Sequence, residues 1–149
     1  MARLLLRAFD PGFRLFTGKH FNDLTDAINN ILGGSTGFIQ QTVATGLTAA
    51  GTNQATALAL TKGINVISTA AASTGVSLPA AATVGIGGSV MIFNDGASAI
   101  KVYSAVGILD TIDGTAGATG VTLTNALRCR YTVTAALTWK SSQLGVVSA

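Results

Sequence analysis

The chain has 149 residues, a net charge of +3, 48% hydrophobic and 10% charged residues, and no glutamate. A typical soluble domain has about a quarter of its residues charged, and mixed surface charge keeps monomers apart. The composition argues against a dedicated nucleic-acid binder, which needs a dense basic face. It predicts a surface that copies of the chain, or another protein, cover.

Membrane and export signals are not evident in the sequence. The most apolar stretch, 70–88, is interrupted by polar and turn residues, whereas a membrane helix needs about 20 continuous apolar residues. Near the start only Leu4, Leu5 and Leu6 form an apolar run, whereas a secretory signal needs roughly 7–15 residues. The single cysteine, Cys129, fits a reducing compartment. We expect synthesis in the cytoplasm and no membrane partner.

Residues 1–17 are expected to form an extended arm. The turn Asp10-Pro11-Gly12 separates two apolar clusters, because proline presets its own torsion and glycine tolerates the next one. Basic side chains flank both clusters. The predicted docking residues are Arg3, Leu4, Leu5, Leu6, Arg7, Phe13, Arg14, Leu15 and Phe16.

A short helix is predicted within residues 18–34. Thr17 can cap its start and Gly33-Gly34 can end it. An apolar seam recurs with 3-4-3 spacing at Phe21, Leu24, Ile28 and Ile31. About two heptads are too short for an isolated coiled coil, so the helix must pack on its own domain, on sister chains or on a host surface. Covering an open end of a sheet and forming a symmetric bundle both remain open.

Residues 35–149 are predicted to form a β domain, an antiparallel sandwich or barrel of jelly-roll type, because short apolar segments recur about every ten residues between glycine-rich turns. The clearest predicted hairpin joins 89–93 to 99–103 through the turn at 94–98. The predicted strands are 56–60, 64–69, 89–93, 99–103, 121–124, 127–134 and 137–141.

Two of these strands carry a recognisable face pattern. Residues 90–93 are apolar on both faces, which predicts a central strand covered on both sides. Residues 127–134 alternate, so Cys129 is expected to be buried as a small hydrophobe while Arg128 and Arg130 lie on the opposite face. The arginine pair has two interpretations, as solvated charges or as a docking contact.

No catalytic or metal-binding pattern is apparent. His20 and Cys129 are the only imidazole and thiol, too few for a zinc site and poorly placed for a nucleophile pair. Asp110 and Asp113 lie near glycine turns, but calcium needs six to eight oxygen ligands. Gly85, Ile86, Gly87 and Gly88 precede a strand and lack the lysine of a phosphate loop. We expect no enzymatic activity and no cofactor.

The organisation of the chain resembles that of small structural proteins of tailed bacteriophage particles. The resemblance is carried by Phe13-Arg14-Leu15-Phe16-Thr17-Gly18, by the helix that begins Phe21-Asn22-Asp23-Leu24, and by the glycine- and threonine-rich segments that begin at Phe93 and Asp113. Such β-modules occur in capsid decoration proteins, head fibres and tail fibres. The resemblance implies a non-enzymatic virion component that is a homo-oligomer, often a trimer.

The resulting expectation is a capsid decoration (cement) protein or short head fibre on the capsid surface of the virion. The arm would insert apolar side chains between subunits of the major capsid protein, and its arginines would meet acidic groups there. The helix seam would support self-association, with a trimer favoured over a dimer. The alternative is a tail-fibre or baseplate-associated protein that binds a receptor or carbohydrate.

Overall fold

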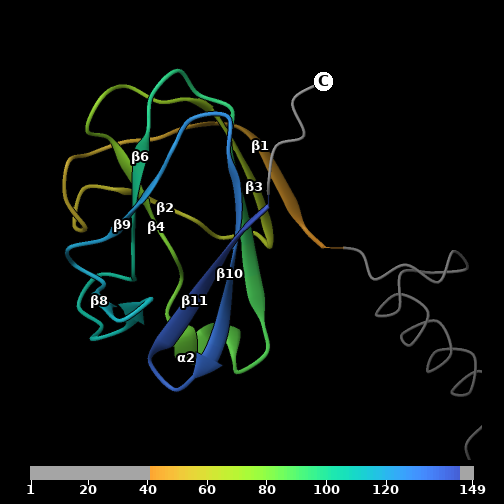
Figure 1. Cartoon of the computed structure of the whole chain (residues 1–149), viewed down its shortest axis with the longest axis vertical. Helices are drawn as coiled ribbons and strands as arrows, with labels where there is room; N and C mark the ends of the chain where they lie inside the picture. The colour runs from red at the N-terminus through yellow and green to blue at the C-terminus, as the bar shows by residue number, and fades with distance from the viewer. Residues whose placement is uncertain (1–40, 145–149) are drawn as a thin grey trace, which may run out of the picture. The chain divides into compact units, whose positions relative to one another are not determined.

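The computed structural model describes residues 41–144, which fold as two facing β-sheets of mixed strand direction (Figure 1). The mainly β, sandwich-like class is confirmed. The predicted arm, the predicted helix and both ends of the predicted β domain, residues 35–40 and 145–149, lie outside the described residues.

Sheet A has seven strands in the order β1-β3-β5-β10-β11-β7-β8, and sheet B has four in the order β2-β4-β6-β9. The strands of sheet A are β1 (Val43–Thr48), β3 (Ile64–Thr69), β5 (Ser89–Asn94), β7 (Thr111–Ile112), β8 (Thr115–Ala116), β10 (Arg128–Ala135) and β11 (Thr138–Leu144). Those of sheet B are β2 (Leu58–Ala59), β4 (Gly75–Ser77), β6 (Ile100–Tyr103) and β9 (Val121–Leu123). One short helix, α2 (Ala81–Val84), links β4 to β5.

The first six strands alternate between the two sheets, so the chain winds around the core in three successive passes. β1, β3 and β5 pair in parallel in sheet A, and β2, β4 and β6 pair in parallel in sheet B. This winding is that of a short two-sided solenoid, in which each pass stacks on the one before it. Antiparallel pairing between strands begins after β6, where β7 pairs with β8, β9 joins β6 and β10 joins β5. The sandwich-like class therefore holds, but the predicted antiparallel pairing was wrong for β1 to β6.

The predicted hairpin between 89–93 and 99–103 was also wrong, because β5 and β6 belong to different sheets. The segment between them is a corner that carries the chain across the core. Asn94 is fully buried there, and its Nδ2 donates to Ser98 O at 3.0 Å and to Leu123 O at 3.2 Å. The Gly96 N–H donates to Asn94 Oδ1 at 3.3 Å. Asn94 thus supplies the hydrogen bonds that ladder pairing would supply in a hairpin.

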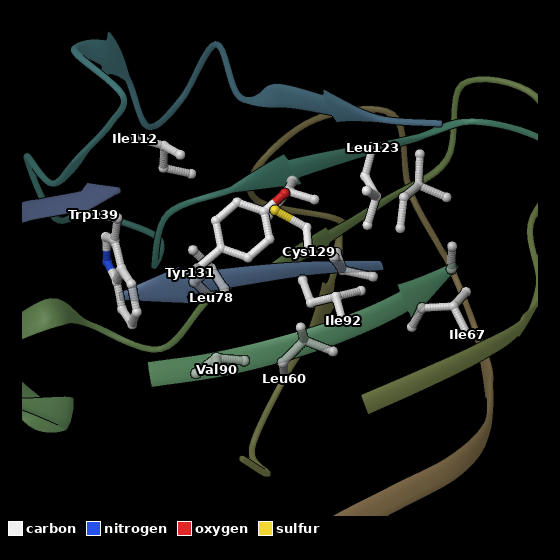
Figure 2. Packing of buried hydrophobic residues seen from close by; sticks show 14 of the residues in the cluster. Leu60, Ile67, Leu78, Val90, Ile92, Ile112, Leu123, Cys129, Tyr131 and Trp139 are labelled. Atoms are coloured by element: carbon white, nitrogen blue, oxygen red, sulfur yellow. The ribbon is translucent and has the colours of Figure 1, made fainter. Parts of the chain in front are cut away.

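The core lies between the sheets and follows from the period-two alternation of the strands (Figure 2). In β10, Cys129, Tyr131 and Val133 point inward, and each is 1% exposed. Trp139 of β11 is the largest fully buried side chain. The remaining core includes Ile67, Val76, Leu78, Val90, Ile92, Ile100, Val102, Ile112 and Leu123. Burial of each such side chain contributes about 1.5–3 kcal/mol relative to its exposure, so this layer dominates stability.

The end of the outer face of sheet B that carries Tyr103 is covered by the loop between β1 and β2. Tyr103 lies on that face, and its hydroxyl donates to Thr52 O at 3.1 Å. Gln54 Nε2 donates to Ser104 O at 3.2 Å and to Ala105 O at 3.0 Å. Because these bonds hold the loop against the end of β6, they bury the Tyr103 ring to 4% exposure.

Candidate interaction surface

The residues first considered for chemistry have structural partners instead. Cys129 is buried, and burial raises the pKa of its thiol above the ordinary value, which favours the unreactive neutral form. Figure 2 shows its sulfur within the core beside the Tyr131 ring. The prediction that Cys129 packs in the core as a small hydrophobe is therefore confirmed. His20 lies outside the described residues.

Asp110 and Asp113 bind different parts of the protein. Asp110 is 1% exposed, and its Oδ2 accepts from the Ala81 N–H at 2.8 Å and from the Trp139 indole N–H at 3.4 Å. Asp113 accepts from the Ser141 N–H at 3.0 Å and from the Ser141 hydroxyl at 2.6 Å. Within residues 41–144, no group of three or more His, Cys, Asp or Glu is placed to hold a metal ion. The two carboxylates fix neighbouring segments in place.

The glycine-rich segment that follows α2 uses its own backbone donors. The Gly85 N–H donates to Ala81 O at 2.9 Å, and the Gly88 N–H to Gly85 O at 3.0 Å. The Gly87 N–H donates to Val133 O at 2.8 Å. Because these three N–H groups already donate within the fold, they are not available to a phosphate. A nearby open cavity of about 210 Å³ is lined mostly by apolar groups, including Pro79, Val84 and Val90.

The outer face of sheet A carries the most distinctive surface chemistry of the described residues. Strand register places its side chains in rows, since paired residues in adjacent strands share a face. One row holds Val66, Phe93, Arg128 and Leu144, and the next holds Val43, Ile64, Met91, Arg130 and Ser142. A third row holds Ser89, Thr132 and Lys140. We call these side chains together the outer face of sheet A.

This face is divided into an apolar half and a cationic half. β1, β3 and β5 contribute Val43, Ile64, Val66, Met91 and Phe93, all at least partly exposed. β10 and β11 contribute three exposed cations, Arg128, Arg130 and Lys140. The Arg128 guanidinium carbon lies 5.2 Å from the centroid of the Phe93 ring, a cation–π contact that joins the two halves.

Two sequence interpretations can now be judged on this face. Arg128 and Arg130 do lie together opposite Cys129, as predicted, and both are exposed. β5 is central, as predicted, but it is not covered on both sides, because Met91 and Phe93 remain partly exposed. The sequence analysis missed Lys140 as a third member of the cation group. Its place on this face follows only from register, because Lys140 pairs with Thr132, which lies on the same face of β10 as Arg130.

Further apolar side chains are exposed away from this face. Leu109 is 87% exposed and Ile86 is 73% exposed. Leu137, in the β10–β11 turn, is also exposed, and its carbonyl accepts from the Thr111 N–H at 2.8 Å, close to Leu109 in the chain. Against these, residues 41–144 carry only five cations and three aspartates. The exterior is therefore poor in the charges that discourage association.

The predicted arm residues and the predicted helix seam, Phe21, Leu24, Ile28 and Ile31, lie outside the described residues, so their roles remain predictions. Comparison with protein-family models, with curated proteins and with solved structures finds no match. No helix in residues 41–144 has the length and apolar character to cross a membrane. The described residues define a two-sheet β domain with a mixed apolar and cationic surface.

Proposed function

We propose that this chain is a structural virion protein that binds the outer surface of a phage capsid as a homo-oligomer and decorates or stabilises it. The observation that carries the proposal is an exterior that combines few charges with exposed apolar side chains such as Leu109, Ile86 and Leu137. Surface charge is what usually keeps soluble proteins apart, so a charge-poor exterior favours association with other chains. The resemblance of the chain to small structural proteins of tailed phage particles supports a phage particle as that assembly.

Attachment at many equivalent positions fits such a surface. A homo-oligomer presents the same contact several times, so a contact that is weak in one copy becomes strong in the assembly. A trimer remains the favoured state over a dimer. The major capsid protein is the proposed partner, and two parts of the chain are available for the contact: the predicted arm in residues 1–17 and the outer face of sheet A.

Fractionation of phage particles tests the proposal. Cells that produce the phage encoding this chain are lysed, the particles are banded by density, and bound antibody is located by electron microscopy. We expect the chain to band with particles and the label to lie on heads. Label on tails would favour the tail-fibre or baseplate alternative, and a chain absent from every particle band would contradict both functions.

Truncation tests the arm separately. A variant that lacks residues 1–17 should keep the circular dichroism of the β domain and lose capsid occupancy if the arm docks. Wild-type occupancy in that variant would exclude the docking role of the arm and leave the β domain as the contact. Light scattering on the full chain should give a mass above that of a monomer, and a monomer at high concentration would contradict the proposed self-association.

A further inference from the structure

We infer that the outer face of sheet A is a docking surface for an acidic protein surface that the partner displays in repeated copies. The inference deepens the proposed function, since it names the chemistry of the partner. It rests on the arrangement of the face itself, and neither the arm nor the helix enters the argument.

The cationic half of the face selects an acidic partner. Arg128, Arg130 and Lys140 lie on two adjacent strands, and register places Arg128 and Arg130 two residues apart on the same side of β10. The Phe93 ring supports the Arg128 guanidinium from one side. A guanidinium held in this way loses less freedom when it pairs with a carboxylate in the bidentate geometry that arginine favours. Of the three aspartates in the described residues, Asp95 is the one next to this face: it lies at the margin, two residues after Phe93.

The apolar half distinguishes a protein partner from a nucleic acid. A duplex presents phosphates along its whole surface, so a nucleic-acid binder needs cations across its contact area. Here Ile64, Val66 and Met91 occupy the half of the face whose strands carry no cation, and Lys62 lies only at its margin, two residues before Ile64. These side chains match a partner that carries apolar groups beside its carboxylates. A second copy of the chain is a poor match through the same face. Depending on the direction of the two-fold axis, an isologous contact would set cations against cations or against apolar side chains, and neither arrangement supplies carboxylates.

The size of the face implies that the partner is repeated. With strands about 4.8 Å apart, β1 to β11 span roughly 19 Å, and three rows of side chains span about 14 Å, or roughly 270 Å². A stable interface buries about 800 Å² on each partner. One face alone is therefore expected to bind weakly, and useful affinity requires several faces on several equivalent patches.

A titration that involves no phage particle tests the inference. The probes are a ten-residue peptide of alternating glutamate and leucine, the same peptide coupled densely to beads, its glutamine counterpart, and a 20-base-pair DNA duplex. Nuclear magnetic resonance of the full-length ¹⁵N-labelled chain locates the contact. We expect the acidic peptide to shift the amides of Arg128, Arg130 and Lys140, with weak affinity free in solution and at least tenfold stronger retention on beads.

Charge variants supply the matched control. Arg128→Gln combined with Arg130→Gln should weaken bead retention about tenfold, since each exposed ion pair accounts for a few-fold in affinity. Lys101→Gln removes a cation from the outer face of sheet B, where Lys101 pairs with Gly75 and Thr122, and should leave retention unchanged. Folding of each variant is checked by its amide spectrum.

Several outcomes would overturn the inference. These are equal shifts around Lys101, equal retention of the arginine variant, equal binding of the glutamine peptide, or tighter binding of the DNA duplex. Higher native mass that depends on the two arginines, without any peptide, would assign the face to a second copy and would also overturn it. Because the probes are synthetic, a negative result here is separate from a negative result in particle fractionation, which would count against the capsid role alone.

Discussion

Asn94 offers a direct test of the corner that replaces the predicted hairpin. In the fold, Asn94 is fully buried and its side chain serves Ser98 O, Leu123 O and the Gly96 N–H. Asn94→Ala removes these partners without introducing a charge. A buried polar group that loses its partner costs about 1–3 kcal/mol. The Leu123 carbonyl is fully buried in this contact and the bond to Gly96 is long, so we expect a total loss of about 3 kcal/mol.

The assay is urea unfolding followed by far-ultraviolet circular dichroism and by the fluorescence of Trp139, the single tryptophan. In thermal unfolding of the same variant, a loss of about 3 kcal/mol should lower the melting temperature by roughly 15 °C in a domain of this size. The matched control is Asn125→Ala, because Asn125 is exposed in the turn before β10. That control should change stability by less than about 0.5 kcal/mol.

The isosteric substitution Asn94→Asp should make the stability of the corner depend on pH. Asn94→Asp keeps an acceptor for Gly96 but turns a carboxylate oxygen toward the carbonyls of Ser98 and Leu123. Repulsion and burial should raise the folded-state pKa of the introduced carboxyl above its unfolded value of about 3.9. The variant should therefore be most stable below about pH 4 and lose stability as the pH rises. If Asn94→Ala behaved like the Asn125 control, Asn94 would be an ordinary exposed turn residue and our account of the corner would be refuted.

Three further predictions concern the core. Gly75→Ala should lower the free energy of unfolding by about 2 kcal/mol, because the added Cβ would lie 2.7 Å from Lys101 O and from the Tyr103 ring. The control Gly63→Ala, whose Cβ would have its nearest neighbour at 3.5 Å, should leave stability nearly unchanged in the same urea assay. Burial raises the pKa of both Tyr131 and Cys129, so the folded state keeps protons that the unfolded state loses at high pH. The urea concentration at the midpoint of unfolding should therefore fall as the pH rises above about 9, and Tyr131→Phe should make this fall less steep. A midpoint that does not change with pH would argue against burial of the two groups. Alkylation of Cys129 should be about 100-fold slower in the native protein than in urea, because the thiol is buried. The variant Arg130→Cys adds an exposed thiol that should react rapidly in the native protein. If Cys129 and the added thiol reacted at the same rate in the native protein, the core position of Cys129 would be wrong.

The positions of most strands were predicted correctly from the local sequence pattern. The strand 64–69 was predicted with the bounds that β3 has, and the alternation of Cys129, Tyr131 and Val133 correctly gave the buried face of β10. All seven predicted strands overlap observed ones, because each combines apolar periodicity with flanking turn residues. These are properties of a few consecutive residues, which a sequence displays directly.

Pairing partners were not available from the same signals. Residues 94–98 have the composition of a hairpin turn, but the same residues also make a corner when the asparagine side chain turns inward. β1 was missed because Gly46 has a positive φ of 70° and the register with β3 shifts around it, which breaks the alternation. β4 is buried on every residue and only three residues long, so it shows no period at all.

The outer face of sheet A was only half visible in the sequence. Two of its three cations, Arg128 and Arg130, could be predicted to share a face because both lie on one alternating strand. Its apolar part depends on register across β1, β3 and β5, which sequence spacing does not specify. The apolar character of β5 on both sides was therefore interpreted as burial rather than as a contact surface.

The three-pass winding has a consequence for biosynthesis. As the polypeptide leaves the ribosome, each new pass can stack on the previous one, so β1 to β6 can find their parallel partners before β9 to β11 emerge. The Tyr131 and Trp139 layer, in contrast, arrives only with β10 and β11. Until β9 and β10 arrive, β6 and β5 each lack a pairing partner at one edge, and such unpaired edges favour misassembly and chaperone binding in that interval.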